Sequence, residues 1–162
     1  MKKKAVQKVA KRALRARRLP SSQLQYGALC YRHTKSGLQV MLVTSRRTKR
    51  WISPKGWPMK GIKPPAVAAT EAYEEAGVRG NVSKNPLGFY SYRKFVNRRE
   101  GMITCLVQAY ALEVTEVVKK FPEAAQRERR WLKPKKAAKK VRESELAALI
   151  RVLADQVNEG SR

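Results

Sequence analysis

Hydrophobic residues follow two patterns along this chain, one typical of β-strands and one typical of helices. The strand pattern comes first. Apolar and β-forming residues dominate residues 25–32 and residues 38–45, and the polar stretch 35–37 between them is typical of a turn. A shorter apolar segment follows at residues 51–53. The pattern therefore predicts two strands joined by a turn, and then a third, shorter strand.

A second pair of apolar and aromatic segments lies further along the chain. Residues 87–95 and 102–112 are separated by a polar stretch at residues 97–101, which predicts a β-hairpin. Residues 130–132 predict one more short strand.

A loop and a helix are predicted between these two groups of strands. Residues 54–65 contain four prolines and two glycines, which no regular element tolerates. Residues 66–76 then carry a helical pattern, and Gly77 is well placed to end the helix because glycine adopts the left-handed conformation without a Cβ penalty.

Two further helices are predicted near the end of the chain, at residues 135–141 and 143–157. The second places its apolar side chains on one stripe, which predicts that it covers one face of the sheet. A dimer surface is the alternative use of this stripe, so a monomer and a homodimer both stay open. Together the elements predict a mixed α/β layered domain.

Composition divides the chain into a basic arm and one domain. Residues 1–19 contain nine Lys or Arg and no acid, with their apolar residues on one side of a helix. A solvated tail is the favoured interpretation of this arm, nonspecific contact with RNA or an acidic lipid surface comes second, and an organellar presequence third. Residues 20–162 fit a single domain.

Charge and cysteine content narrow the class of protein further. The chain has 37 Lys and Arg against 12 Asp and Glu, a net charge of +25, which favours polyanionic partners. Cys30 and Cys105 lie in apolar runs without metal-ligand spacing, which predicts buried, reduced thiols and a cytoplasmic protein. No apolar stretch approaches the ~20 residues of a transmembrane helix.

Three glutamates stand out against this basic background. The first seventy residues contain no Asp or Glu, and then Glu71, Glu74 and Glu75 follow within five positions. Their spacing places them on one face of the predicted helix. A solvated acidic face, ion pairs with distant cations and a site for a hard cation such as Mg²⁺ are the three interpretations. The opposite face, predicted to pack on the sheet, carries Ala69, Ala72, Tyr73 and Ala76.

The segment at residues 56–78, GWPMKGIKPPAVAATEAYEEAGV, resembles the Nudix box. That family pattern is Gly, five residues, Glu, seven residues, then Arg-Glu-apolar-any-Glu-Glu-any-Gly-apolar. The chain departs from it at Ile62, where the family has its first glutamate, and at Thr70, where it has the arginine. The matching residues are Gly56, Glu71, Ala72, Glu74, Glu75, Gly77 and Val78.

Flanking sequence extends the resemblance over most of residues 23–157. The segments YGALCYR, LVTSRRTKRWISPKGW and RERRW look like those of diphosphoinositol and diadenosine polyphosphate hydrolases. The resemblance implies a Nudix fold, an α/β/α sandwich with a mixed sheet and a loop-helix catalytic motif. It also implies a Mg²⁺-dependent (or Mn²⁺-dependent) enzyme that cleaves the diphosphate bond of a nucleoside diphosphate derivative, dinucleoside polyphosphate or diphosphoinositol polyphosphate. The alternative is a catalytically impaired module that binds RNA or a phosphorylated ligand.

The metal-site residues follow from the same resemblance, and the phosphate contacts from charge and position in the chain. Glu74 and Glu75 are implied metal ligands, Glu71 is a further ligand or the catalytic base, and Glu128 is a candidate ligand from a later loop. Trp51 is expected in the core, and His33 in a surface turn. The predicted substrate-binding residues, chosen as phosphate contacts near the signature or in later Arg clusters, are Ser45, Arg46, Arg50, Lys55, Gly56, Arg98, Arg99, Arg127 and Arg129.

Overall fold

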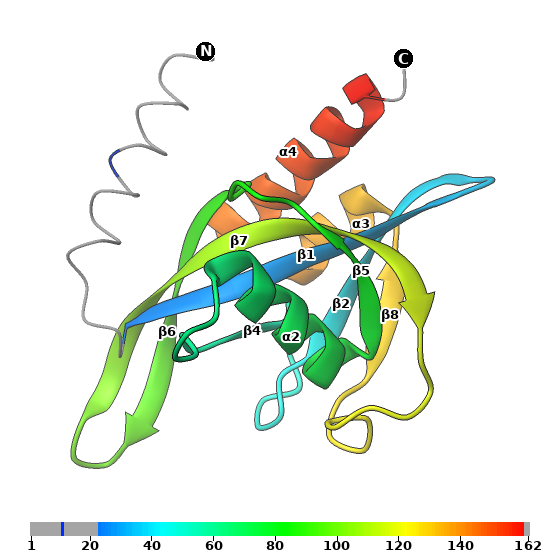
Figure 1. Ribbon diagram of the computed structural model, residues 1–162. Helices are drawn as coiled ribbons and strands as arrows, with labels where there is room; N and C mark the ends of the chain where they lie inside the picture. The colour runs from blue at the N-terminus through cyan, green and yellow to red at the C-terminus, as the bar shows by residue number, and fades with distance from the viewer. Residues whose placement is uncertain (1–10, 12–22, 161–162) are drawn as a thin grey trace.

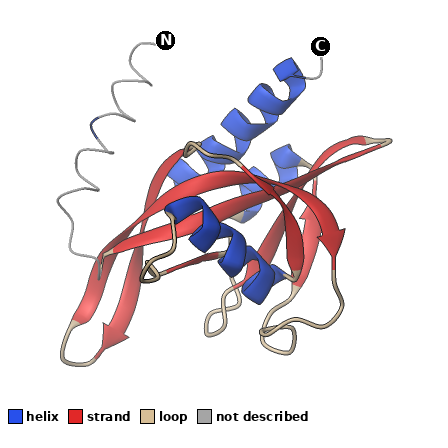
Figure 2. Ribbon diagram, viewed as in Figure 1, coloured by secondary structure: helices blue, strands red, loops and turns tan. Residues whose placement is uncertain are grey.

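A computed structural model of the protein describes Lys11 and residues 23–160. The predicted basic arm, apart from Lys11, lies outside these residues. Within them, one mixed β-sheet lies between helices on its two faces (Figure 1), and loops join the strands at both ends (Figure 2).

The first half of the sheet forms around two long antiparallel strands. Strand β1 (Leu24–Thr34) pairs with β2 (Gly37–Thr44), as the predicted turn between them requires. Strand β2 also pairs with β3 (Trp51–Ile52) on one edge and with β8 (Arg129–Leu132) on the other. A two-residue strand that the proline-rich pattern did not predict, β4 (Lys55–Gly56), pairs with β1.

Strand β7 (Gly101–Val117) connects the second half of the sheet to the first. It pairs antiparallel with β6 (Gly88–Asn97), which confirms the predicted hairpin, and with β5 (Val78–Val82). Its other edge pairs in parallel with β1, so that residues 24–31 lie beside residues 106–113. This parallel pair makes the sheet mixed.

Helices cover both faces of the sheet. Helix α2 (Pro64–Ala76) packs on one face, and α3 (Pro134–Lys140) and α4 (Ser144–Gly160) pack on the other (Figure 1). Each face has its own apolar cluster. The predicted α/β/α sandwich is therefore confirmed.

The stripe of α4 packs on this sheet. Leu146, Ile150 and Leu153 are buried in the core cluster that includes residues of β1, β2 and β7, and Val157 packs against it. The stripe is thus used within the chain, as the first interpretation expected. No helix in the described part of the chain is long and apolar enough to cross a membrane.

Several local predictions need correction. Helix α2 begins at Pro64, two residues earlier than predicted, because proline lacks only an N–H that the first helical turn leaves unpaired anyway. His33 is exposed but lies within β1 and not in a turn. Tyr73 does not join the core; the guanidinium of Arg79 lies 4.3 Å from its ring centroid. Cys30 and Cys105 are buried free cysteines, as predicted.

The end of α2 is fixed by two residues. Gly77 has φ 63° and ψ 39°, the left-handed conformation predicted for it, and its N–H donates to Tyr73 O at 2.9 Å. The guanidinium of Arg129 donates to the carbonyl oxygens of Ala76 and Gly77 at 2.8 and 3.3 Å. A cation thus lies at the negative end of the helix dipole and holds the helix against β8.

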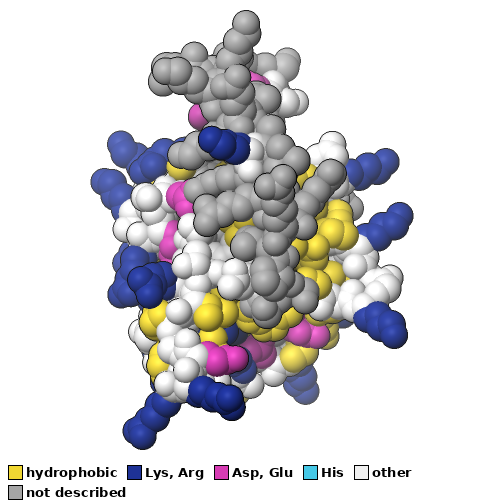
Figure 3. Space-filling model, turned by 90° about the vertical axis from the view of Figure 1, so that its left-hand side faces the viewer, with side chains coloured by type: hydrophobic (Ala, Val, Ile, Leu, Met, Phe, Trp, Pro, Cys, Tyr) yellow, Lys and Arg dark blue, Asp and Glu magenta, His cyan; other side chains and the backbone are white. Residues whose placement is uncertain are grey.

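Surface charge is unevenly distributed. On the face shown in Figure 3, Lys and Arg side chains project around the rim, while apolar side chains gather toward the middle and acidic side chains are few. This agrees with the net charge of +25.

Candidate active site

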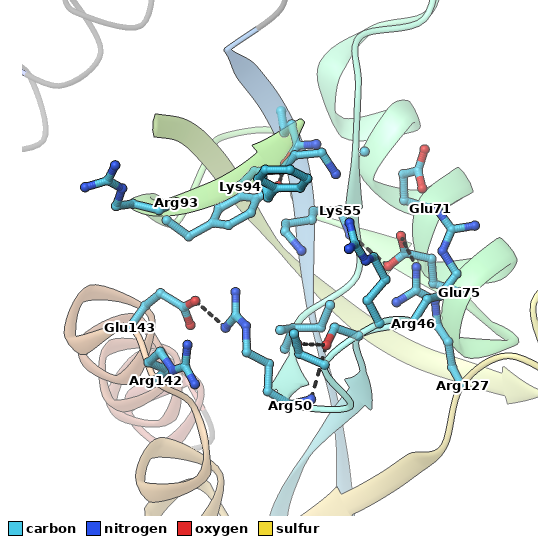
Figure 4. Close-up of a pocket in the computed structure, with 18 of the residues that line it drawn as sticks. Arg46, Arg50, Lys55, Glu71, Glu75, Arg93, Lys94, Arg127, Arg142 and Glu143 are labelled. Atoms are coloured by element: carbon cyan, nitrogen blue, oxygen red, sulfur yellow. Dashed lines mark hydrogen bonds and ion pairs between the residues drawn. The ribbon is translucent and has the colours of Figure 1, made fainter. Parts of the chain in front are cut away.

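A pocket of about 850 Å³ opens beside α2 and collects side chains from distant parts of the chain (Figure 4). Its walls come from the β2–β3 loop, β4, α2, the β6–β7 hairpin, the segment before β8 and the connection between α3 and α4. The charged side chains lining it are Arg46, Arg47, Arg50, Lys55, Glu71, Glu75, Arg93, Lys94, Glu123, Arg127, Arg142 and Glu143.

Glu71 reaches the pocket because Gly56 leaves room for it. A Cβ atom placed on Gly56 would lie only 2.1 Å from Glu71 Oε1 and 2.2 Å from its carboxyl carbon. Strand β4 therefore approaches α2 closely, and the opening glycine of the signature shapes the space that the glutamate occupies.

The Glu71 carboxyl is strongly affected by its surroundings. Burial, followed by repulsion from Glu75, Glu74 and Glu123, raises its pKa to about 7. A glutamate that is half protonated near neutral pH suits a proton acceptor, and it also marks a position that a bound cation would stabilise.

Glu75 is buried and forms an ion-pair network, whereas the sequence pattern predicted that it faces outward. Arg127 Nη2 lies 3.2 Å from Glu75 Oε1 and 3.3 Å from Glu123 Oε1, and both side chains of the Glu75 pair are less than a tenth exposed. The backbone N–H of Lys55 donates to the other Glu75 oxygen at 3.2 Å. Burial nevertheless raises the pKa of Glu75.

Lys55 extends from β4 into the middle of the pocket, between the α2 carboxylates and Arg50 (Figure 4). Its ammonium group lies 4.7 Å from the ring centroid of Tyr92. Desolvation lowers its pKa to about 8, and Glu75 opposes this while Arg50 and Arg127 add to it. The ammonium is thus poorly solvated, which strengthens its attraction for a bound anion.

Arg50 is held at the opposite side of the pocket by Glu143. Arg50 Nη1 and Glu143 Oε1 form an ion pair at 2.5 Å, and the Glu143 side chain is about nine-tenths buried. The backbone N–H of Arg50 donates to the Ser45 hydroxyl at 3.1 Å, and Ser45 N–H donates to Arg50 O at 2.8 Å. These bonds close the β2–β3 loop and direct Arg50 into the pocket.

The structure brings most of the predicted phosphate contacts together. The pocket is lined by Ser45, Arg46, Arg50, Lys55, Gly56 and Arg127. Arg98 and Arg99 instead lie in the exposed turn between β6 and β7, outside the lining. Arg129 is also outside it, because its guanidinium caps α2.

The predicted metal ligands are placed unequally. Glu71 and Glu75 line the pocket, whereas Glu74 and Glu128 are not among its lining residues. Glu128 is exposed, and its backbone N–H donates to Thr44 Oγ1 at 2.8 Å. The carboxylate that the later loop contributes to the pocket is Glu123.

These carboxylates have the donor chemistry that hard divalent cations prefer. Burial raises the pKa of Glu71 most, and the neighbouring carboxylates of Glu75, Glu74 and Glu123 raise it further. In the described part of the chain, no three His, Cys, Asp or Glu side chains are grouped closely enough to hold a metal ion. Arg127 instead forms ion pairs with both Glu75 and Glu123 and supplies positive charge between them.

Both residues that depart from the signature are uncharged, and neither is buried. Ile62 is 46% exposed, in the loop before α2. The Thr70 hydroxyl donates to Ala66 O at 2.9 Å, one turn earlier in its own helix.

Several pocket residues were not predicted from the sequence. Tyr92 donates to Gln25 Oε1 at 2.5 Å, and both line the pocket with Glu143. One signal could have identified Glu143, since it is the first acid after a run of cations in residues 129–142. Trp51 is half-buried and packs against the core, as predicted, and Trp57 is 38% exposed and lines the pocket.

Comparison of the sequence with known proteins identifies relatives. No protein-family model matches the chain. It is 34% identical over 127 residues to Nudix hydrolase 13, mitochondrial, of Arabidopsis thaliana. The aligned residues cover 74% of this chain and 63% of the relative. It is 30% identical over 113 residues to diphosphoinositol polyphosphate phosphohydrolase 3-alpha of Homo sapiens, and the aligned residues cover 68% of this chain and 64% of that relative. The chain thus spans less than two thirds of either relative's length.

Solved structures share the fold. An Ap4A hydrolase of C. elegans superposes with a TM-score of 0.60 at 16% identity, covering 83% of this chain and 97% of that one. The E. coli dihydroneopterin triphosphate pyrophosphohydrolase gives 0.62 at 15% identity, covering 83% and 96%. The protein therefore has the Nudix fold. Its resemblance to the Nudix hydrolase superfamily, including the diphosphoinositol polyphosphate phosphohydrolases, is confirmed by these relatives.

Proposed function

We propose that this chain is a Mg²⁺-dependent or Mn²⁺-dependent hydrolase that cleaves a phosphoanhydride bond in a phosphorylated small molecule. The observation that carries the proposal is the pocket itself. It places the carboxylates of Glu71, Glu75 and Glu123 in one cavity with Arg50 and Lys55. Carboxylates that can hold a hard cation, next to fixed cations that can hold phosphate, are what diphosphate hydrolysis requires.

The cations of the pocket would bind and orient the substrate. Arg50, fixed by Glu143, and the poorly solvated Lys55 would contact phosphate oxygens from one side. Arg46, more than half exposed in the β2–β3 loop, would contact them from the mouth of the pocket. Such positioning neutralises the charge that otherwise repels an attacking water.

The glutamates would share the remaining tasks. Glu71, whose pKa of about 7 suits a base near neutral pH, would accept a proton from the attacking water or ligate the cation. Glu74, Glu75 and Glu123 would provide the remaining carboxylate ligands. Glu123 would thereby take the ligand role that was predicted for Glu128 of the same loop. A bound divalent cation supplies charge neutralisation and a more acidic water.

The names of the relatives suggest substrates. A diphosphoinositol polyphosphate, a dinucleoside polyphosphate and a nucleoside diphosphate derivative all combine phosphoanhydride bonds with high negative charge, which matches the basic pocket. We place the enzyme in a reducing compartment because both cysteines are free; the cytoplasm is our first choice, and the mitochondrial names of two relatives make the mitochondrion the alternative.

A panel of diphosphate substrates tests the proposal. With Mg²⁺ or Mn²⁺, the wild-type protein should release phosphate product, and Glu71→Gln should reduce turnover by about 10²- to 10⁴-fold, the range of general acid–base catalysis. Glu74→Gln tests its predicted role as ligand. Glu116→Gln is the matched control because its ion pair with Arg79 is exposed and outside the pocket.

The second candidate is a binding module without turnover, favoured by Ile62 and Thr70 at signature positions. It predicts no product from any substrate in the panel, together with phosphate-ligand binding that persists when EDTA removes divalent cations.

A further inference from the structure

Exposed apolar side chains are concentrated at the pocket. Among the described residues, six large apolar side chains are exposed, and Trp57, Phe95 and Met102 of these line the pocket. Exposed apolar surface beside so many cations indicates a ligand with an uncharged part as well as phosphates.

Phe95 and Met102 form one surface. They are directly opposite each other in the β6–β7 hairpin, and cross-strand partners of an antiparallel pair project on the same face. Phe95 is 45% and Met102 is 47% exposed. A flat aromatic ring next to a polarisable thioether is a surface on which another flat ring packs well.

A cation borders this surface. The guanidinium of Arg47, from the β2–β3 loop, lies 5.6 Å from the ring centroid of Phe95. Arg47 also lines the pocket, in the same loop as Arg46 and Arg50. The apolar surface therefore lies next to the groups that would hold phosphate.

We propose that Phe95 and Met102 are specificity-determining residues that stack against a planar heteroaromatic ring, so that the enzyme prefers a nucleoside-containing substrate to a diphosphoinositol polyphosphate. A nucleotide joins a flat, largely uncharged ring to a phosphate chain, which matches the apolar pair and its cationic border. An inositol ring carrying several phosphates presents charge in most directions and would leave the apolar pair unpaired. The inference rests on the proposed function of this site.

Competing substrates test the inference. Turnover of diadenosine tetraphosphate and of diphosphoinositol pentakisphosphate is measured with Mg²⁺ for wild type, Phe95→Ala, Phe95→Trp and Val117→Ala. Phe95→Ala should lower kcat/KM for the adenosine substrate about tenfold, the scale of one lost base stack, and leave the inositol substrate unchanged. Phe95→Trp should retain the preference. Val117, equally exposed on β7 but outside the pocket, is the matched control.

A binding experiment separates this inference from the proposed hydrolysis. Adenosine 5′-(α,β-methylene)diphosphate and methylenediphosphonate, which differ by the nucleoside, are titrated into wild type and Phe95→Ala. Tenfold weaker binding of the adenosine compound alone supports the proposed stacking on Phe95 even if no substrate is hydrolysed, in which case only the proposed function fails.

Three results would overturn the inference. Equal loss for both substrates would make Phe95 a general structural residue, and no loss for either would remove its role. A change in size-exclusion elution volume on Phe95→Ala, with substrate preference unchanged, would show instead that a second copy of the chain covers this surface.

Discussion

Gly56 and Glu71 fit against each other across the gap between β4 and α2. A Cβ on Gly56 would lie 2.1 Å from Glu71 Oε1, a distance that atoms do not adopt. The obstacle is the end of a flexible side chain, so an alanine at position 56 should displace the carboxylate and leave the backbone in place.

We therefore expect Gly56→Ala to fold normally and to lose about 10²-fold in activity, since a displacement of about 1 Å can have that cost. Steady-state kinetics and thermal denaturation check this. In the Glu71→Ala background, where the obstructing carboxylate is gone, Gly56→Ala should cause no further loss. An additional loss there would assign Gly56 a role independent of Glu71.

Arg127 is expected to be important for stability. Arg127→Met removes the partner of a buried Glu75, which should lower the free energy of unfolding by about 3–5 kcal/mol. Urea denaturation measures it. The exposed pair of Arg79 and Glu116 provides the control, because Arg79→Met should change stability by less than about 1 kcal/mol. Similar effects of the two substitutions would contradict the network.

The raised pKa of Glu71 predicts a pH dependence of stability without metal. Because its pKa is higher in the folded protein than the ordinary value of 4.5, the folded state binds this proton more tightly. The contribution of Glu71 should therefore be most favourable below pH 4.5 and should be lost as pH rises toward about 7. Denaturation in EDTA at several pH values should show wild type falling relative to Glu71→Gln across this window. A constant difference would exclude the predicted titration.

Glu123 and Glu128 provide a direct test of which later glutamate serves the site. Mn²⁺ titration should show affinity reduced by about 10- to 100-fold in Glu123→Gln, the range typical of lost supporting ligands, and unchanged in Glu128→Gln. The opposite result would restore the original candidate, Glu128.

Local features of the fold were predictable where one segment determines its own structure. The conformation of Gly77 and the hairpin of β6 and β7 follow from short-range sequence signals. Strand β5 was missed because Gly80 and Asn81 weaken its pattern, and it forms only by pairing with β7.

The site was likewise predictable only where the spacing of residues within one segment determined it. Spacing placed the three glutamates on one helix, but it could not reveal that Glu75 points inward, because its partner Arg127 is distant in sequence and reaches it only through the tertiary structure. Tyr92 and Glu143 carry no motif, and only the arrangement of hairpin and helices brings them to the pocket.

The parallel pairing of β1 with β7 also has a consequence for how the protein folds. Residues 24–31 must find residues 106–113, and the whole signature loop and α2 lie in the stretch of chain between them. Such long-range pairing carries a loop-closure entropy and is slow to form. The pocket, in which the α2 carboxylates meet the cations that face them, should therefore be assembled late during folding.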